Sequence, residues 1–320
     1  MNRADAILAF LRGSETYVSG DSIASRLRIT RTAVWKQLKH LEKMGYTFEK
    51  LKGAGYRLLS APDRLYPWEI ERFLETSFVG REIVYRDSLD STNALAFRLA
   101  IEGANEGTCV VAESQSAGRG RLSRQWYSPH AKNLYVSVVL RPSVHPASVY
   151  PLSFISSLAA FDTVKRAGVE PRLKWPNDVL IGSRKVCGTL IDLSIEADAV
   201  RFVVVGIGLN INMDRRDMDA DLADRATSLL METKNCFERA RICGILLGSL
   251  ETYYERGRRE GLERICSLWE ERAKVRGTYM EINQMDRVFR GVSEGIDRDG
   301  ALLLNENGVV TRVIAGDVVV

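Results

Sequence analysis

Two segments of the chain carry residue types that could bind an anionic ligand. The first, Glu113–Trp126, places Arg119, Arg121 and Arg124 around two glycines. Arginine guanidinium groups are planar, permanently charged donors that suit carboxylates and phosphates, and glycine lets the backbone approach a ligand closely. The second segment, Lys174–Asp178, reads Lys-Trp-Pro-Asn-Asp. We therefore predict that the first segment is a flexible loop that closes over an anion.

The alternative for the arginine- and glycine-rich segment is a disordered tail that binds nucleic acid. Such tails are usually longer and lack folded flanks, whereas Thr108–Ser114 and Asn133–Leu140 on either side both have the composition of β-strands. A ligand-binding loop between two strands is the better interpretation. The residues alone leave the ligand open.

The whole chain has the features of an ordinary globular protein. Its 320 residues predict two or three domains, and 45% of them are hydrophobic and 27% charged. No apolar run approaches the roughly 20 residues that a membrane span needs, and the N-terminus lacks the features of a secretory signal, so we expect a cytoplasmic protein. The five cysteines and three histidines are scattered, which disfavours a disulfide framework and a zinc site.

The charge distribution singles out the N-terminal part. Residues 1–60 carry 11 Lys and Arg against five Asp and Glu, a net charge of +6, and the rest of the chain carries 34 against 36. This asymmetry predicts a nucleic-acid-binding module joined to a near-neutral body. The pattern of apolar residues predicts three helices over residues 4–11, 19–27 and 30–44, with Ser19 or Asp21 capping the second.

A short turn joins the second and third of these helices, as in a helix-turn-helix. Residues 46–59 contain two β-prone segments around Lys52–Gly55, which predicts a hairpin and completes a winged helix. The third helix would enter the major groove, and the hairpin would touch phosphates. The residues predicted to contact DNA are Arg31, Thr32, Trp35, Lys36, Lys39, Lys50 and Lys52. The alternative is a unit that serves only protein interaction or packing. Residues 60–67 contain two prolines and predict a linker.

The body from residue 67 to about 273 alternates strand-like and helical segments. Helices are expected up to Leu99, over 150–167 and over 237–258, and β-structure over 172–193 and over 201–212, where Gly206 and Gly208 break the run. The mixed order with hairpins indicates an α+β domain with a mixed sheet, not a doubly wound sheet. No third glycine opens a helix after Gly208, so the glycines form no dinucleotide fingerprint. Glycines inside a strand more often mark the close approach of a ligand or another backbone.

The C-terminal segment has a different pattern from the body of the chain. Short β-prone runs follow residue 274, and Asp299-Gly300 and Asn307-Gly308 are typical hairpin turns. Short strands joined in this way predict a small SH3-like β-barrel at the C-terminus.

Five motifs follow one another along the body. They are Ser91–Asn93, Gln115 with Gly118–Arg121, Lys174–Asp178, Arg184–Lys185 with Gly188, and Gly206–Asn212. These motifs resemble those of biotin–protein ligases, and with the winged helix in front the whole chain resembles the bifunctional bacterial type, which is both a biotin–protein ligase and a biotin operon repressor. The resemblance covers essentially all 320 residues. One departure is Ser123, which stands before Arg124 where the family commonly has glycine, and it bears on the stiffness of the loop.

The resemblance implies a winged helix-turn-helix over 1–62, a ligase domain over 67–273 and an SH3-like domain over 274–320. It implies that ATP activates biotin to biotinyl-5′-AMP and that the biotin then passes to a lysine of a carboxylase carrier domain. It also implies repression of biotin genes with biotinyl-AMP as corepressor. ATP, Mg²⁺ and biotin are the implied ligands. A biotin carboxyl carrier protein domain, operator DNA and a second copy of the chain are the implied partners.

The resemblance also implies residue roles. Lys185, Arg119 and Arg121 would be catalytic, with Lys185 contacting the biotin carboxylate and the reacting phosphoryl oxygens. The implied biotin-binding residues are Ser91, Thr92, Asn93, Gln115, Gly118, Arg119, Gly120, Arg121, Lys185 and Gly188. The implied ATP-binding residues are Trp126, Lys174, Asn177, Asp178, Asn210 and Arg290. Asp178 would also hold Mg²⁺.

The residues alone leave other interpretations open. Lys185 could be a solvated turn lysine, Ser91 to Asn93 could be only a helix cap, and Trp126 could be core filling. Other functions to weigh are a lipoate–protein ligase-like acyl-adenylate enzyme and a ligand-sensing repressor without catalysis. A ligase with a vestigial winged helix is a further possibility.

Overall fold

The computed structural model describes residues 3–284 and 287–319, apart from the side chain of Ser123. The chain divides into two compact units, one that ends at Asp63 and one that begins at Arg64. None of the helices in these described ranges combines the length and the apolarity that crossing a bilayer requires.

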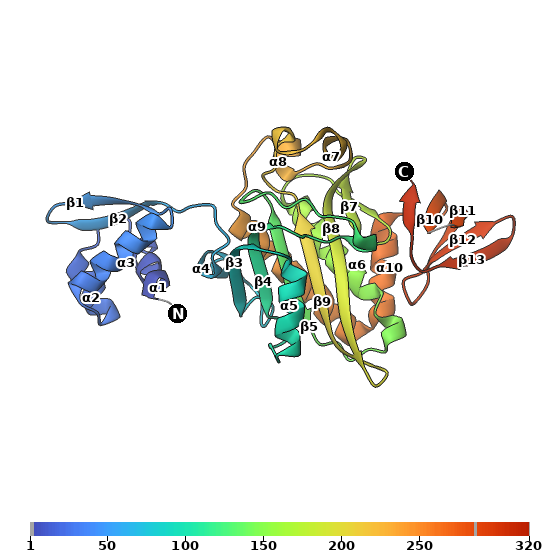
Figure 1. Cartoon of the computed structure of the whole chain (residues 1–320), viewed down its shortest axis with the longest axis horizontal. Coiled ribbons are helices and arrows are strands. Elements are labelled where there is room, and N and C mark those ends of the chain that lie inside the picture. The colour runs from blue at the N-terminus through green and yellow to red at the C-terminus, as the bar shows by residue number, and fades with distance from the viewer. Residues whose placement is uncertain (1–2, 285–286, 320) are drawn as a thin grey trace. The chain divides into compact units, whose positions relative to one another are not determined.

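The N-terminal unit is a winged helix-turn-helix. Three helices, α1 (Arg3–Arg12), α2 (Gly20–Leu27) and α3 (Arg31–Lys43), precede the antiparallel hairpin of β1 (Thr47–Leu51) and β2 (Gly55–Ser60) (Figure 1). The three predicted helices and the predicted hairpin are therefore confirmed.

Side-chain caps begin α2 and α3, and an apolar stripe buries one face of α3. Ser19 caps α2, and the Thr30 hydroxyl oxygen accepts a hydrogen bond from the Ala33 N–H at 3.1 Å at the start of α3. In α3 the side chains of Val34, Leu38 and Leu41 are buried at helical spacing. The remaining face of the helix is left to solvent.

The second unit is built on a seven-stranded sheet. In spatial order the strands are β3 (Ile83–Leu89), β4 (Cys109–Gln115), β5 (Leu134–Leu140), β9 (Ala199–Leu209), β8 (Arg184–Glu196), β7 (Asp178–Ile181) and β6 (Arg172–Lys174). Only β3 and β4 pair in parallel, and the other neighbours are antiparallel. The sheet is mixed, which confirms the predicted α+β class.

Helices cover both faces of this sheet (Figure 1). The face toward α6 (Pro151–Arg166), α9 (Arg239–Glu260) and α10 (Leu262–Ala273) forms the main core. The face toward α5 (Thr92–Ile101) forms a smaller core. Successive side chains of a strand point to opposite faces, so β4, β5 and β9 contribute residues to both cores. Short helices α4 (Pro67–Glu71), α7 (Ala220–Arg225) and α8 (Leu229–Thr233) complete the unit.

One strand differs from the prediction. The interpretation that Gly206 and Gly208 break the run was wrong, because β9 continues through both glycines and ends at Leu209. Both residues keep their ladder partners on β5 and β8. The glycines therefore mark a place where another group approaches the sheet closely.

The C-terminal strands form a separate five-stranded antiparallel sheet. Its spatial order is β13 (Val309–Val313), β12 (Leu302–Glu306), β11 (Arg287–Ile296), β10 (Tyr279–Gln284) and β14 (Asp317–Val319). Asn307 and Gly308 have φ of 53° and 88°, as a two-residue hairpin turn requires. A β-rich C-terminal domain was predicted and is present, although β14 was not foreseen.

A buried ion pair fixes the start of this unit to its sheet. Glu113 on β4 and Arg239 on α9 are both fully buried, and their charged groups lie 2.8 Å apart. The other oxygen of Glu113 accepts a hydrogen bond from the Leu65 N–H at 2.8 Å, and Arg239 donates to the Asn133 carbonyl at 3.1 Å. The pair therefore holds together four segments of the chain, at Leu65, Glu113, Asn133 and Arg239.

We predict that Glu113→Gln lowers the free energy of unfolding by about 3–5 kcal/mol, because it leaves the Arg239 charge buried without its counter-charge. Urea denaturation measures the change. Glu196→Gln is the matched control, because Glu196 forms an exposed ion pair with Arg201 at 3.6 Å, and exposed pairs contribute less than about 1 kcal/mol. Equal losses in the two variants would contradict the structural role given to Glu113.

Candidate functional site

A cavity of about 870 Å³ opens beside the end of the central sheet. The N-terminus of α5, the loop after β4, strands β6 to β9, the end of α7 and Asp317 on β14 contribute its walls. Most of the residues predicted for the site line this one cavity. They are Ser91, Thr92, Asn93, Gln115, Arg119, Gly120, Arg121, Trp126, Lys174, Asn177, Asp178, Lys185, Gly188 and Asn210.

Two predicted residues do not line the cavity. Gly118 lies immediately behind it, where a Cβ atom would come within 2.7 Å of the Trp126 carbonyl oxygen and 2.9 Å of Gln115 Nε2. The structure does not bring Arg290 to the cavity, because that residue pairs with Glu281 across β10 and β11 at 2.8 Å. The C-terminal domain reaches the cavity through Asp317 instead.

A polar network surrounds the start of α5. The side-chain oxygen Oε1 of Gln115 accepts from the Thr92 N–H at 2.8 Å and from the Thr92 hydroxyl at 3.1 Å. Ser137 Oγ lies 2.8 Å from the Thr92 hydroxyl and 2.6 Å from Asn93 Oδ1. Ser91 caps the helix, its side chain accepting from the Ala94 N–H, so the expected capping role is present. The network also fixes several hydroxyl and amide groups at the cavity wall.

Three glycines form the floor of the cavity. A Cβ on Gly206 would collide with Asn93 Oδ1, and a Cβ on Gly208 would collide with the Trp126 ring. A Cβ on Gly188, the ladder partner of Gly208, would come within 2.8 Å of Lys185 Cε. The absence of side chains at these positions therefore lets the other groups lie directly on the sheet.

The Trp126 ring occupies the space that these glycines leave. The Lys185 ammonium lies 5.4 Å from the centre of the ring, within cation–π range. The buried indole N–H has no hydrogen-bond partner among the residues that the structure describes. A buried donor without a partner is rare in a native protein, so this ring is better explained as part of a ligand site than as core filling.

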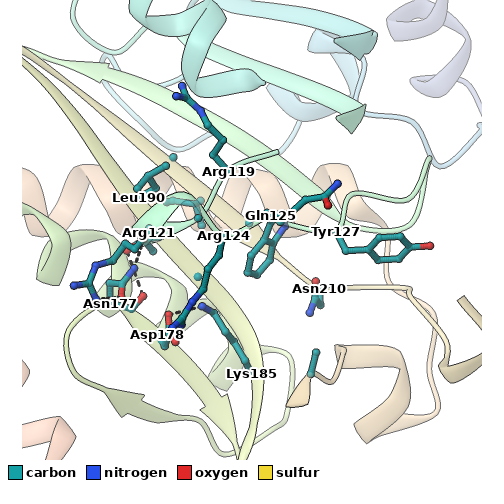
Figure 2. A pocket seen from close by; sticks show the side chains of 18 of the residues that line it. Arg119, Arg121, Arg124, Gln125, Tyr127, Asn177, Asp178, Lys185, Leu190 and Asn210 are labelled. Carbon is teal, nitrogen blue, oxygen red and sulfur yellow. Dashed lines mark hydrogen bonds and ion pairs between the residues drawn. The ribbon is translucent and has the colours of Figure 1, made fainter. Parts of the chain in front are cut away.

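Three cationic side chains lie near Asn177, Asp178 and Asp317 in the cavity wall. Lys185 Nζ lies 2.6 Å from Asp178 Oδ1, Arg121 donates to Asn177 Oδ1 at 3.3 Å, and Arg124 pairs with Asp317. Figure 2 shows Arg121, Arg124 and Lys185 converging on the region of Asn177 and Asp178. Each of these side chains is oriented by a partner, which places positive charge on one side of the cavity.

Two further cations are placed differently. Arg119 points away from the converging group (Figure 2), and its side chain has no ion pair among the described residues. Lys174 is half-buried, and burial lowers the pKa of its ammonium group, an effect that the nearby Asp178 carboxylate opposes. An anion in the cavity would therefore meet cations that are incompletely neutralised.

Asn177 and Asn210 both form hydrogen bonds within the protein. Asn177 Nδ2 donates to the Thr189 carbonyl. Asn210 Nδ2 donates to the Thr227 carbonyl at 3.0 Å, and its oxygen accepts from Asn133 at 3.2 Å. Asn177 thus ties the segment between β6 and β7 to β8, and Asn210 ties the end of β9 to the segment before α8. The departure at Ser123 concerns a side chain outside the described residues.

Other residues of the cavity were missed by the sequence interpretation. Apolar and aromatic walls come from Leu190, Ile207, Tyr127 and Tyr135, and further charges come from Asp224, Arg225 and Asp317. The apolar residues read only as strand residues in the sequence. The 224–225 segment and Asp317 reach the cavity through the tertiary fold, which no local pattern indicates.

Fold and site together define a class of protein. A winged helix-turn-helix is followed by an α+β unit whose cavity combines a polar network, an aromatic ring and several cations. Family models match in three places: an HTH domain over residues 3–57, the biotin/lipoate A/B protein ligase family over 85–210, and the biotin protein ligase C-terminal domain over 281–320.

Known proteins resemble the chain over almost its whole length. The bifunctional ligase/repressor BirA of Bacillus subtilis is 36% identical over 317 residues, which are 99% of this chain and 98% of that protein. BirA of Escherichia coli is 28% identical over 98% of this chain and 95% of that protein. The biotin protein ligase of Aquifex aeolicus in complex with biotin and ATP superposes with a TM-score of 0.63 at 25% identity, covering 75% of this chain and 98% of that one. The chain belongs to the biotin protein ligase family.

We predict that Gly208→Ala displaces the Trp126 ring, because the added methyl group and the indole cannot share the space. Overpacking of this kind costs about 1–3 kcal/mol of stability. The tryptophan emission spectrum should shift, and the shift should be absent when Trp126→Phe is the background. Gly248→Ala on α9 is the control, because no heavy atom lies within 4 Å of its added Cβ. A Trp126 signal that Gly208→Ala leaves unaltered would refute the packing described.

Proposed function

We propose that the protein is an ATP-dependent biotin–[carboxylase carrier protein] ligase that also binds DNA as a repressor of biotin genes. The observation that carries the proposal is the single cavity, in which a polar network, an aromatic ring and oriented cations lie around a glycine floor. The family membership supports the same assignment.

The first half-reaction needs positive charge. A carboxylate oxygen of biotin attacks the α-phosphorus of ATP, and the bond to the pyrophosphate oxygen breaks. Two anions must approach each other, so fixed cations lower the barrier most. Lys185 fits the role of stabilising the reacting oxygens, because Asp178 at 2.6 Å and the Trp126 ring hold its ammonium in place. Arg119 and Arg121 would enclose the product.

The biotin head has two N–H donors and one carbonyl oxygen. The network of Ser91, Thr92, Asn93 and Gln115 supplies both acceptors and donors at one wall. Leu190 and Ile207 supply apolar surface beside it. A compact bicyclic ligand with a polar ureido edge suits this wall.

The nucleotide would use the rest of the cavity. Trp126 offers a ring for stacking on adenine, and Lys174, Asn177 and Asp178 lie where phosphates would pass. No cluster of three or more His, Cys, Asp or Glu side chains able to hold a metal occurs in the described ranges. Mg²⁺ in nucleotide sites takes one or two carboxylates, with phosphates and water completing its shell, so Asp178 fits as a single protein ligand. The metal would neutralise phosphate charge.

The second half-reaction transfers biotin to a partner. A lysine amine of a carrier domain attacks the acyl carbon of biotinyl-adenylate and AMP leaves. The mixed anhydride is destroyed by water, so the loop that carries Arg119, Gly120 and Arg121 has a reason to close over it.

DNA binding would use the N-terminal unit, which we assign to residues 1–62, with the ligase domain over 67–273 and the SH3-like domain over 274–320. All of the residues predicted to contact DNA are exposed: Arg31, Thr32, Trp35, Lys36, Lys39, Lys50 and Lys52. Glu42 partly neutralises Lys39 and Lys50 at 2.8 and 2.7 Å. A homodimer promoted by biotinyl-AMP would present two such helices to a two-fold operator.

We predict that Lys185→Gln lowers kcat for adenylation by about 10²–10³-fold, because it removes the charge that stabilises the reacting oxygens. Pyrophosphate release that depends on biotin and ATP-Mg²⁺ measures the step, with lipoate in place of biotin as the substrate control. Lys234→Gln, an exposed lysine on the α8 side, should leave kcat unchanged. A Lys185→Gln enzyme with wild-type kcat, or equal activity on lipoate, would rule the assignment out.

We predict that Lys36→Gln with Lys52→Gln weakens binding to a mixed-sequence duplex and flattens its salt dependence. Each lost phosphate contact removes about 0.9 from the slope of log K against log salt, so the double variant should lose about 1.8. Fluorescence anisotropy at several salt concentrations gives the slope. Arg259→Gln with Lys234→Gln is the charge-matched control. A slope identical to that of the wild type would leave the N-terminal unit without the proposed contacts.

A further inference from the structure

A second cavity of about 1060 Å³ lies beside the first within the same unit. It is bounded by β6, the end of α10 and the C-terminal strands β10 and β14. Lys174 and Ser183 line both cavities. The two spaces therefore adjoin at these side chains.

The second cavity has an excess of positive charge. Arg272 pairs with Asp162 at 2.7 Å, and Lys165 pairs with Glu170 at 3.9 Å. The three remaining cations of the lining are Arg172, Lys174 and Lys274, and the one further carboxylate in the lining is that of Glu271. Lys174 also lies near the Asp178 and Asp317 carboxylates of the first cavity. None of these three cations has an ion pair among the residues that the structure describes.

The strand geometry directs two of the cations to the same side. Arg172 and Lys174 are two residues apart on β6, so their side chains share one face of the strand, and Leu173 between them is buried in the core. Arg172 is exposed and Lys174 is half-buried. A negatively charged group could therefore pass from a half-buried cation at the shared wall to an exposed one further out.

We propose that the second cavity receives the pyrophosphate that leaves ATP during adenylation, with Arg172, Lys174 and Lys274 as its anchors. The proposal rests on the function proposed above. When the bond between the biotin oxygen and the α-phosphorus forms, the bond from the α-phosphorus to the bridging oxygen breaks. The bridging oxygen keeps the electron pair and departs with the β- and γ-phosphates.

The chemistry explains why such a site belongs beside the first. In phosphoryl-type transfer the attacking and leaving oxygens are roughly in line, so the leaving group departs away from biotin. Pyrophosphate carries several negative charges, and flexible lysine and forked arginine side chains are suited to it. A separate cavity also lets pyrophosphate leave while the adenylate stays enclosed under the loop that carries Arg119, Gly120 and Arg121, here called the arginine loop.

The test uses the full-length protein with Arg172→Gln and Lys274→Gln combined. Product inhibition of adenylation by inorganic pyrophosphate should weaken by about five- to twentyfold, since two partly exposed charge contacts are lost. The KM for ATP should also rise, because the same cations contact its β- and γ-phosphates. Transfer from preformed biotinyl-adenylate to a carrier domain involves no pyrophosphate, so its rate should not change. Arg259→Gln with Lys234→Gln removes the same charge elsewhere and should alter neither the inhibition by pyrophosphate nor the KM for ATP.

The two half-reactions separate the possible outcomes. Wild-type sensitivity to pyrophosphate in the Arg172→Gln, Lys274→Gln protein would overturn the proposal. So would a defect confined to transfer, which would indicate that an acidic surface of the carrier docks there. If the wild type makes no adenylate at all, the function proposed above fails. If the wild type is active and the double variant keeps wild-type sensitivity to pyrophosphate, only the pyrophosphate site fails.

Discussion

The site depends on the close approach of two side chains to the face of a β-sheet. Gly206 and Gly208 on β9 and Gly188 on β8 leave the room, and Asn93 and Trp126 fill it. Any larger residue at these positions would collide with the polar network or with the indole ring. Because β8 and β9 stay paired through the glycines, the groups above them are positioned by the central part of the sheet.

Charge is arranged around this floor in two ways. Lys185, Arg121 and Arg124 are each oriented by a partner, Asp178, Asn177 and Asp317 respectively. The pair of Glu113 and Arg239, buried below the loop, ties β4 to α9 and to the backbone at the start of the unit. The strand that leads into the arginine loop is thus anchored, while the loop itself projects into the cavity. Such an arrangement suits a loop that closes over a ligand while the strand before it, β4, stays in place.

The sequence predicted much of the fold because its signals are local. Ser19 and Thr30 cap helices, Gly45 at φ 99° ends α3, and Asn307-Gly308 forms a hairpin. The ordered motifs predicted most of the cavity residues as well. The errors arose where tertiary contacts decide. The glycine at 208 indicated a close approach, but no local pattern indicated that the Trp126 ring makes it. Neither the distance of Arg290 from the cavity nor the presence of Asp317 has a local signal.

One cavity is proposed to hold biotin and ATP together and to make biotinyl-adenylate. Native mass spectrometry of the protein after incubation with biotin and ATP-Mg²⁺, followed by rapid desalting, is the decisive experiment. We expect a retained ligand with the mass of biotinyl-adenylate, and only when both substrates are present. Biotin bound alone, with ATP unconsumed, would contradict it and leave a ligand-binding protein without the reaction.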